Sequence, residues 1–358
     1  MLKRNIIVVG ASAGGVEELK KLVTCLPKDF DGSMFIVLHI PAYSPSSLPH
    51  ILSRCNVFEV LHPKDGEKIQ PKKIYVAPPN HHLLIEKNTV LIKKGPKENR
   101  FRPSIDALFR SAAYTFGSRV IGIILSGTLD DGTSGMWTIK RLGGLAIVQL
   151  PSEASHPEMP MNVMEFVDVD HCISVENMCD QIGYAEEKPI APKDAVTKTE
   201  IEILELEIAI PKHNNAFALS IIDQGALTSF TCPECNGSLI RLVEGKIIRF
   251  RCHAGHGFTA SALLAALTQH IEDSLVVSMR AMEECTRLLK NLSNNYRSIG
   301  QHDAADFFGN AEEENRQRAT VIHESIFSQK ALSADFRFLQ KVKEPAAGTS
   351  KKKKKNKE

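Results

Sequence analysis

Residues 5–15 read NIIVVGASAGG, an apolar run that passes directly into a stretch of glycine, alanine and serine. The run shows no polar alternation, which is typical of a strand that is buried on both faces of a parallel sheet. Apolar residues at helical spacing follow over Val16–Cys25, so the stretch predicts a buried strand, a tight turn and a helix. Ser12 lies in that turn.

Strand and helix signals of the same kind recur along the first half of the chain. Their alternation predicts βαβ units, and hence a doubly wound α/β domain with a mostly parallel sheet over residues 1–185. Three short strands among proline and asparagine turn signals predict an antiparallel insertion, at Ile74–Val76, Leu83–Glu86 and Thr89–Ile92. The segments that predict the parallel units are the strands Ile6–Val9, Phe35–His39, Val120–Leu125 and Leu145–Gln149 and the helices Val16–Cys25, Ile105–Tyr114 and Ser134–Leu142.

Length and composition limit the class of protein. The 358 residues, 43% of them hydrophobic, predict two folded units with connectors. The formal net charge is only +2 and the basic excess lies in Lys351–Lys355, so bulk charge does not indicate nucleic-acid binding. No segment reaches the roughly 18 apolar residues of a membrane span, and the N-terminal run is too short for a signal peptide. The eight cysteines are not spaced as a disulfide framework, so we expect a cytoplasmic protein.

The character of the sequence changes after the first domain. We interpret residues 186–227 as a linker, because they open with prolines and charged residues and no sustained apolar pattern. A small cysteine module is expected at 228–259. Two stretches of helical periodicity, Ala260–Leu292 and His302–Phe327, predict a helical hairpin over 260–330. Residues 331–358 end in a lysine-rich run and are predicted to be a disordered basic tail.

The turn around Ser12 has the composition of a nucleophile elbow. A strand-to-helix turn exposes the hydroxyl at the carboxyl edge of the sheet, and small neighbours permit its sharpness. Backbone N–H groups at the start of the following helix could donate to an oxyanion. Glycines before a helix also suit a phosphate or dinucleotide, and this loop alone leaves that alternative open.

Two further candidates lie where predicted strands end. His39 closes one strand and could accept the proton of the serine hydroxyl, although a hydrogen-bonded histidine at a strand end is an equal alternative. Asp130 and Asp131 follow another strand, and one of them could orient the imidazole. A helix N-cap is the plainer role for either, and the spacing does not choose between them.

These motifs together resemble the catalytic domain of CheB, the chemotaxis receptor methylesterase, over roughly residues 5–180. Several motifs matched in order make the resemblance specific. They are Gly10-Ala11-Ser12-Ala13-Gly14-Gly15, Leu38-His39-Ile40-Pro41, Tyr75-Val76-Ala77-Pro78-Pro79-Asn80-His81-His82, Arg102-Pro103-Ser104-Ile105-Asp106, Asp131-Gly132 and Glu158-Met159-Pro160.

The resemblance implies a protein-glutamate methylesterase that needs no cofactor for catalysis. Ser12 would be the nucleophile, His39 the general base and Asp131, rather than Asp130, the third member of the triad. The substrate would be a glutamyl methyl ester of a chemoreceptor or another signalling protein, hydrolysed through an acyl-enzyme with release of methanol. Family members can also hydrolyse a glutaminyl amide by the same route.

The sequence departs from the family pattern in several places. Chemotaxis members normally carry a receiver domain ahead of the esterase, so we expect no aspartyl-phosphate control within this chain, and a separate regulatory partner is one candidate for that role. Thr128 and Leu129 stand where relatives commonly carry methionine and glycine, and Ala13 follows the serine where threonine or serine is frequent. A non-catalytic signalling adaptor that binds partners through its second half is the competing class.

The cysteine module has the spacing of a zinc site. Cys232 and Cys235 form one close pair, and Cys252 is followed by His253 and His256. Tetrahedral zinc takes four such ligands, so three thiolates and one imidazole predict a closed, structural Zn²⁺ site in a zinc-ribbon-like module. We favour His256 over His253, because three intervening residues let the chain turn back on the metal. A metal-free dithiol is the alternative, and the few basic residues argue against nucleic acid.

Overall fold

Seven parallel strands form the central sheet of this computed structural model, which describes residues 4–187, 196–213 and 225–328. The strand order is β10-β9-β8-β1-β2-β5-β3, so the chain starts in the middle, builds one side and then returns to build the other. Every neighbouring pair is parallel. The strands are β1 (Ile6–Ala11), β2 (Ser33–Leu38), β3 (Glu59–Leu61), β5 (Lys73–Val76), β8 (Val120–Ile124), β9 (Leu145–Gln149) and β10 (His171–Ile173).

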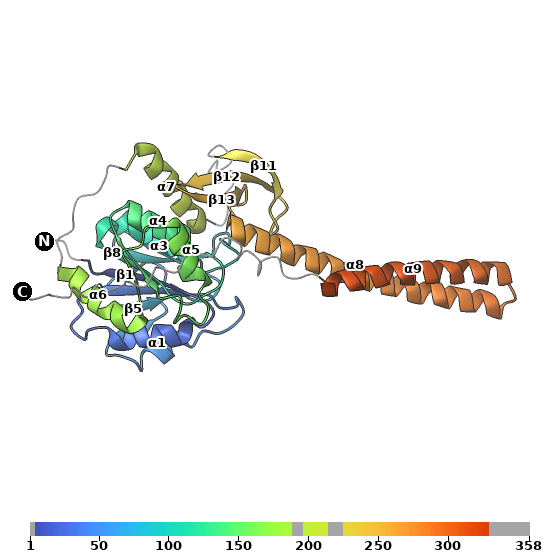
Figure 1. The fold of residues 1–358 in the computed structure, drawn as a ribbon, viewed down its shortest axis with the longest axis horizontal. Helices are drawn as coiled ribbons and strands as arrows, with labels where there is room; N and C mark the ends of the chain where they lie inside the picture. Colours follow the sequence, from blue (N-terminus) through green and yellow to red (C-terminus); the bar gives the residue numbers. More distant parts are fainter. Residues whose placement is uncertain (1–3, 188–195, 214–224, 329–358) are drawn as a thin grey trace, which may run out of the picture. The chain divides into compact units, whose positions relative to one another are not determined.

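Helices cover both faces of this sheet, as the doubly wound prediction requires (Figure 1). Ile7 and Val9 of β1 pack into one apolar core with α1 (Gly15–Cys25) and α6 (Val175–Glu187). Ile6 and Val8 point the other way, into a second core with α3 (Ile105–Phe116) and α4 (Thr133–Arg141). All four side chains are buried, which explains why the sequence of β1 shows no polar alternation. Shorter helical elements are α2 (Leu48–Leu52), η1 (Gly117–Arg119) and α5 (Glu158–Phe166).

The antiparallel insertion is confirmed, but it is built differently from the prediction. It consists of β4 (Glu67–Lys68), β7 (Thr89–Lys93) and β6 (His82–Glu86), in that order. The predicted strand Ile74–Val76 is not part of it, because β5 pairs in parallel with β2 in the central sheet. A short apolar strand fits either sheet, and the sequence carries no sign of the partner that it finds.

Part of the predicted linker is a folded helix. α7 (Lys198–Lys212) begins at a capping box in which Thr197 and Glu200 exchange hydrogen bonds. Leu204, Glu207 and Ile208 are buried. The prediction of a linker over all of 186–227 was therefore wrong for α7, because its buried charged residue hides the apolar face in the sequence. Residues 188–195 and 214–224 of that range lie outside the described part of the chain.

The cysteine module is a four-stranded antiparallel sheet, which we call the ribbon. Its strands are β11 (Ala226–Thr231), β12 (Ser238–Glu244), β13 (Ile247–Cys252) and β14 (Gly257–Thr259). The chain divides into the units Met1–Ala266 and Leu267–Glu358, so the ribbon belongs to the same unit as the central sheet.

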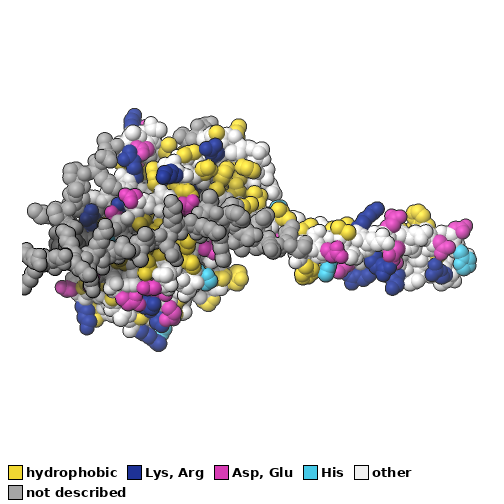
Figure 2. All heavy atoms as spheres, viewed as in Figure 1, with side chains coloured by type: hydrophobic (Ala, Val, Ile, Leu, Met, Phe, Trp, Pro, Cys, Tyr) yellow, Lys and Arg dark blue, Asp and Glu magenta, His cyan; other side chains and the backbone are white. Residues whose placement is uncertain are grey.

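The predicted helical hairpin is present as α8 (Ala260–Ser298) and α9 (His302–Ser328). The two helices pack together where Tyr296 stacks on Phe308 and Ser293 donates to the carbonyl of Ala305. Charged side chains of both signs lie along them (Figure 2).

The predicted disordered tail from residue 331 lies outside the described residues. Within the described ranges no helix combines the length and apolar character that crossing a bilayer requires, and the cytoplasmic location stays a prediction.

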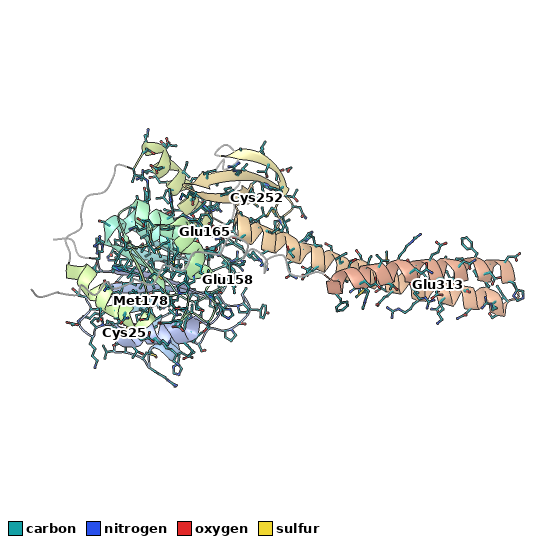
Figure 3. All side chains as sticks on the ribbon, viewed as in Figure 1. Cys25, Glu158, Glu165, Met178, Cys252 and Glu313 are labelled. Atoms are coloured by element: carbon teal, nitrogen blue, oxygen red, sulfur yellow. A yellow bond between two sulfur atoms is a disulfide. The ribbon has the colours of Figure 1, made fainter. Side chains whose placement is uncertain are left out.

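A disulfide joins Cys25 at the end of α1 to Cys179 in α6, two helices on one face of the sheet (Figure 3 labels Cys25 and the neighbouring Met178). The sequence analysis did not pair these cysteines. The two residues are 154 positions apart, and only the packing of α1 against α6 brings their Cα atoms to 5.9 Å. The remaining six cysteines form no disulfide.

We expect opening of Cys25–Cys179 to lower the free energy of unfolding by about 2–4 kcal/mol, because the bond restricts the unfolded chain. The Cys25→Ser variant should therefore melt below the wild type without reductant and should not respond to reductant. Cys285→Ser, which removes an exposed free thiol on α8, is the matched control and should behave as the wild type does. A wild-type melting temperature that reductant leaves unchanged would contradict the pairing.

Candidate active site

The three predicted catalytic residues follow three neighbouring strands. Ser12 comes directly after β1, His39 directly after β2, and Asp131 lies in the loop after β8. Because the strands are parallel and adjacent, their carboxyl ends form one edge at the point where the strand order reverses, the usual ligand site of such sheets. The backbone hydrogen bonds between these strands continue into the loops that follow them. The N–H of Ser12 donates to the carbonyl of Ser126 at 2.9 Å, and the N–H of His39 donates to the carbonyl of Ala11 at 3.1 Å.

The loop that carries Ser12 is as tight as the sequence predicted. Gly14 has a φ of 75°, in the left-handed region, and α1 begins at the next residue. A Cβ at Gly127 in the facing loop would lie 2.9 Å from the Cβ of Ser12, so glycine is needed there for the two loops to approach. Ser12 itself is half-buried and lies three residues before the start of α1.

His39 and Asp131 form a buried pair. The Nε2 atom of His39 lies 2.8 Å from Oδ2 of Asp131, and only 3% and 1% of their side chains are exposed. The neutral ring therefore carries its proton on Nε2 and donates it to the carboxylate. The other ring nitrogen, Nδ1, is buried and has no hydrogen-bond partner among the described residues. That nitrogen is the atom left to accept a proton from a nucleophile.

The carboxylate of Asp131 is surrounded by donors besides His39. Asn99 Nδ2 and Ser104 Oγ donate to Oδ1 at 2.8 and 2.9 Å, and the backbone N–H of Ile105 donates to Oδ2 at 2.7 Å. Burial raises the pKa of Asp131, but these hydrogen bonds and the contact with His39 outweigh it and bring the pKa below its usual value. The carboxylate is thus held ionised, in the form that stabilises an imidazolium.

Asp130, the rival candidate, turns away from His39. Its carboxylate accepts hydrogen bonds from the hydroxyls of Thr259, at 2.7 Å, and of Ser261. Burial raises the pKa of this carboxyl above its usual value. The structure therefore brings Asp131, and not Asp130, to the histidine.

Sequence reasoning did not assign four residues that shape this site. Besides Asn99 and Ser104, they are Phe101 and Asp106. The ring of Phe101 stacks on the imidazole of His39 with centroids 3.7 Å apart. Asp106 accepts from the backbone N–H groups of Gly132, at the N-cap of α4, and of Gly135 in its first turn, and burial together with the charge of Asp131 raises the pKa of Asp106 well above normal.

The loop before Asp131 is fixed at Leu129, one of the positions that depart from the family pattern. Leu129 has a φ of 62°, which is unfavourable for a residue with a branched side chain. Its N–H donates to Glu158 at 3.1 Å and its carbonyl accepts from Asn162 at 2.7 Å, both on α5. These bonds hold the strained backbone beside the serine loop.

A second site lies in the ribbon, where Cys232, Cys235, Cys252 and His256 bring their ligand atoms within 4.8 Å of one another (Figure 3 labels Cys252). The Sγ atoms of Cys235 and Cys252 are 3.5 Å apart. A tetrahedron with Zn–S bonds of about 2.3 Å has edges of about 3.8 Å, so the spacing fits zinc. His253 instead packs its ring against Gly237, and the structure gathers His256 with the cysteines.

Comparisons with known proteins match the first half of the chain. A family model described as CheB methylesterase matches residues 7–182. A protein of Leptospira interrogans, provisionally named protein-glutamate methylesterase/protein-glutamine glutaminase, is 40% identical over 176 residues, which are 49% of this chain and 91% of that protein. Protein-glutamate methylesterase/protein-glutamine glutaminase 2 of Methanosarcina acetivorans is 33% identical over 187 residues, 50% of this chain and 52% of its own length. The chain thus spans about half the length of the latter.

Among solved structures, the CheB methylesterase catalytic domain of Thermotoga maritima matches with 30% sequence identity and a TM-score of 0.48. The match covers 50% of this chain and 96% of that domain.

Proposed function

This chain belongs to the CheB methylesterase family, and on that premise we propose that it hydrolyses glutamyl methyl esters with Ser12 as its nucleophile. It is a carboxylic ester hydrolase, as its named relatives are. The substrate is a methylated chemoreceptor or another signalling protein that carries methylated glutamates.

The buried pair of His39 and Asp131 is the observation that supports this mechanism most. Nδ1 of His39 takes the proton of the Ser12 hydroxyl as Oγ attacks the ester carbon. The tetrahedral intermediate then collapses, and the imidazolium returns the proton to the departing methoxide, which leaves as methanol. Water, deprotonated by the same nitrogen, attacks the acyl-enzyme, and the proton returns to Ser12 Oγ as the glutamyl carboxylate of the substrate protein is released. Asp131 stays ionised throughout and stabilises the imidazolium.

The start of α1 supplies the electrostatic part of the mechanism. The first backbone N–H groups of a helix lack partners within the helix and carry partial positive charge. Ser12 lies three residues before the first residue of α1, and the N–H of Gly15 is already bonded to the Ser12 carbonyl at 2.9 Å, so we infer that the remaining N–H groups of this turn would donate to an oxyanion on the substrate. The same acyl route would hydrolyse a glutaminyl amide, with ammonia as the leaving group.

A non-catalytic adaptor explains the site less well. Burying the Asp131 carboxylate is unfavourable unless hydrogen-bond donors surround it. Asn99 and polar groups at the start of α3 provide these donors. An adaptor that binds partners through its second half would have no use for a buried carboxylate joined to a histidine with a free nitrogen.

We expect Ser12→Ala to abolish the release of methanol from a methylated chemoreceptor, because the acyl-enzyme cannot form. The loss should be at least about a thousandfold, since removal of a triad member typically costs that much or more. Ser53→Ala, which removes an exposed serine hydroxyl in the segment after α2, is the matched control and should retain the wild-type rate. Equal release by Ser12→Ala and the wild type would rule out the mechanism.

We further propose that Cys232, Cys235, Cys252 and His256 hold a structural Zn²⁺. Three thiolates and one imidazole are a ligand set that zinc prefers, and all four positions are filled by protein groups, which leaves none for a substrate. Two of the cysteines are buried, so their thiolates would need a cation to compensate their charge.

Elemental analysis of the purified protein should find one zinc per chain. Cys232→Ser should lose that zinc, because an alcohol does not replace a thiolate ligand at neutral pH. Cys285→Ser removes a thiol on α8 outside the cluster and should keep the full amount. Wild-type protein without zinc would show that the cluster is a metal-free set of thiols, and equal zinc in both variants would show that Cys232 is not a ligand.

A further inference from the structure

The segment Lys97–Phe101, which we call the clamp loop, lies between the ribbon and the catalytic pair. Asn99 and Arg100 have φ values of 50° and 74°, which residues with side chains adopt only where the surroundings hold them. Strand β14 of the ribbon provides that hold. Asn99 donates its N–H to the carbonyl of Gly257 at 2.8 Å, and Gly257 donates to that of Lys97 at 3.2 Å.

The side chain of Asn99 joins the ribbon to the catalytic acid. Its Oδ1 accepts from the backbone N–H of Thr259 at 3.0 Å, while its Nδ2 donates to Oδ1 of Asp131 at 2.8 Å. Both contacts are buried, and each uses a different end of the same amide. A displacement of Thr259 would therefore be transmitted to Asp131 through the planar side-chain amide of Asn99.

The clamp loop also contacts the catalytic base. Phe101 stacks on His39 with an angle of 8° between the ring planes. At the other end of the loop, the buried carboxylate of Glu98 pairs with Arg249 and Arg251 of β13, and with Arg110 of α3 at 2.5 Å. The ribbon thus fixes the loop by its side chains as well as by its backbone.

A second route runs through the residue that precedes the catalytic acid. Asp130 is buried, and its carboxylate is held by Thr259 and Ser261. The contacts of Thr259 therefore lead both to the clamp loop and to the loop that carries Asp131. These two loops supply the stacking ring and the acid that orient His39.

We propose that the ribbon is a positioning element of the active site: β14, through Asn99 and Asp130, holds His39 and Asp131 in their catalytic arrangement. The inference rests on the proposed function of the pair and assigns Thr259 as a positioning residue. β14 begins directly after His256, and Cys252 donates its N–H to the carbonyl of His256 at 3.1 Å. A Zn²⁺ held by this cluster would therefore fix the turn from which β14 starts, and it would affect catalysis only by holding that turn.

A docking role for the ribbon would give a different kinetic result. If it only bound the protein substrate, its loss would raise KM for the methylated receptor and leave a small ester unaffected. If it positions the catalytic pair, kcat must fall even for p-nitrophenyl acetate, which is too small to reach the ribbon and Ser12 together. The reaction of Ser12 with a fluorophosphonate reports the same competence, whatever the natural substrate is.

The test compares Thr259→Val, Thr259→Ser and wild type in the full-length zinc-bound protein. Thr259→Val keeps the β-branched shape and loses the hydroxyl, so we expect kcat for p-nitrophenyl acetate and the fluorophosphonate labelling rate to fall about 10- to 100-fold, with KM unchanged. Thr259→Ser restores the hydroxyl and should return both rates to near wild type. Thr320→Val, on α9, loses a hydroxyl that bonds only its own helix and should match wild type.

Chelation of the metal from the wild type gives an independent measurement, in which Ser12 labelling should slow by a similar factor. An unchanged labelling rate in folded metal-free protein would overturn the proposal, and wild-type rates in Thr259→Val would overturn its route through Asp130, because the backbone N–H of Thr259 still donates to Asn99 in that variant. A holoenzyme that labels at Ser12 but releases no methanol would refute the methylesterase assignment alone, and the ratios between variants would still decide the role of the ribbon.

Discussion

The candidate active site depends on the burial of one negative charge, the carboxylate of Asp131. A carboxylate removed from water must find donors, and this one takes them from the end of β2, the clamp loop and the start of α3. Segments far apart in the chain therefore converge on a single point. His39 is held by that convergence with one nitrogen committed to the carboxylate and the other free, so its orientation follows from the charge that it touches.

The sequence carried enough local information to locate the candidate site. Strands buried on both faces are recognisable in the sequence as apolar runs, and glycines indicate some of the turns that follow them. Ser12, His39 and Asp131 could therefore be placed at strand ends. Contacts between distant segments were not accessible in this way. Asn99 meets Thr259 across 160 positions, and Cys25 meets Cys179 across 154. The sequence did not reveal α7 because the buried face of this helix carries Glu207, whose partners are two arginines of β13 and Arg110 of α3.

The ribbon is more than an appended module. Arg249 and Arg251 are fully buried, and their carboxylate partners come from α7 and from the clamp loop. Removing either side of such a network would leave charge without compensation, so the parts are expected to fold as one body. The family match ends at residue 182, before α7 and the ribbon. In this chain the core that matches the family therefore packs a loop of its candidate active site against β14, which lies outside that match.

The protonation of His39 tests the account most directly. Nitrogen-15 NMR of the full-length protein, with the histidines assigned through a His39→Gln variant, distinguishes the two tautomers of the neutral ring. The account predicts a proton on Nε2, shared with Asp131, and an unprotonated Nδ1 available to Ser12. A proton on Nδ1 in the neutral ring would contradict it, because that nitrogen could then accept nothing from the serine.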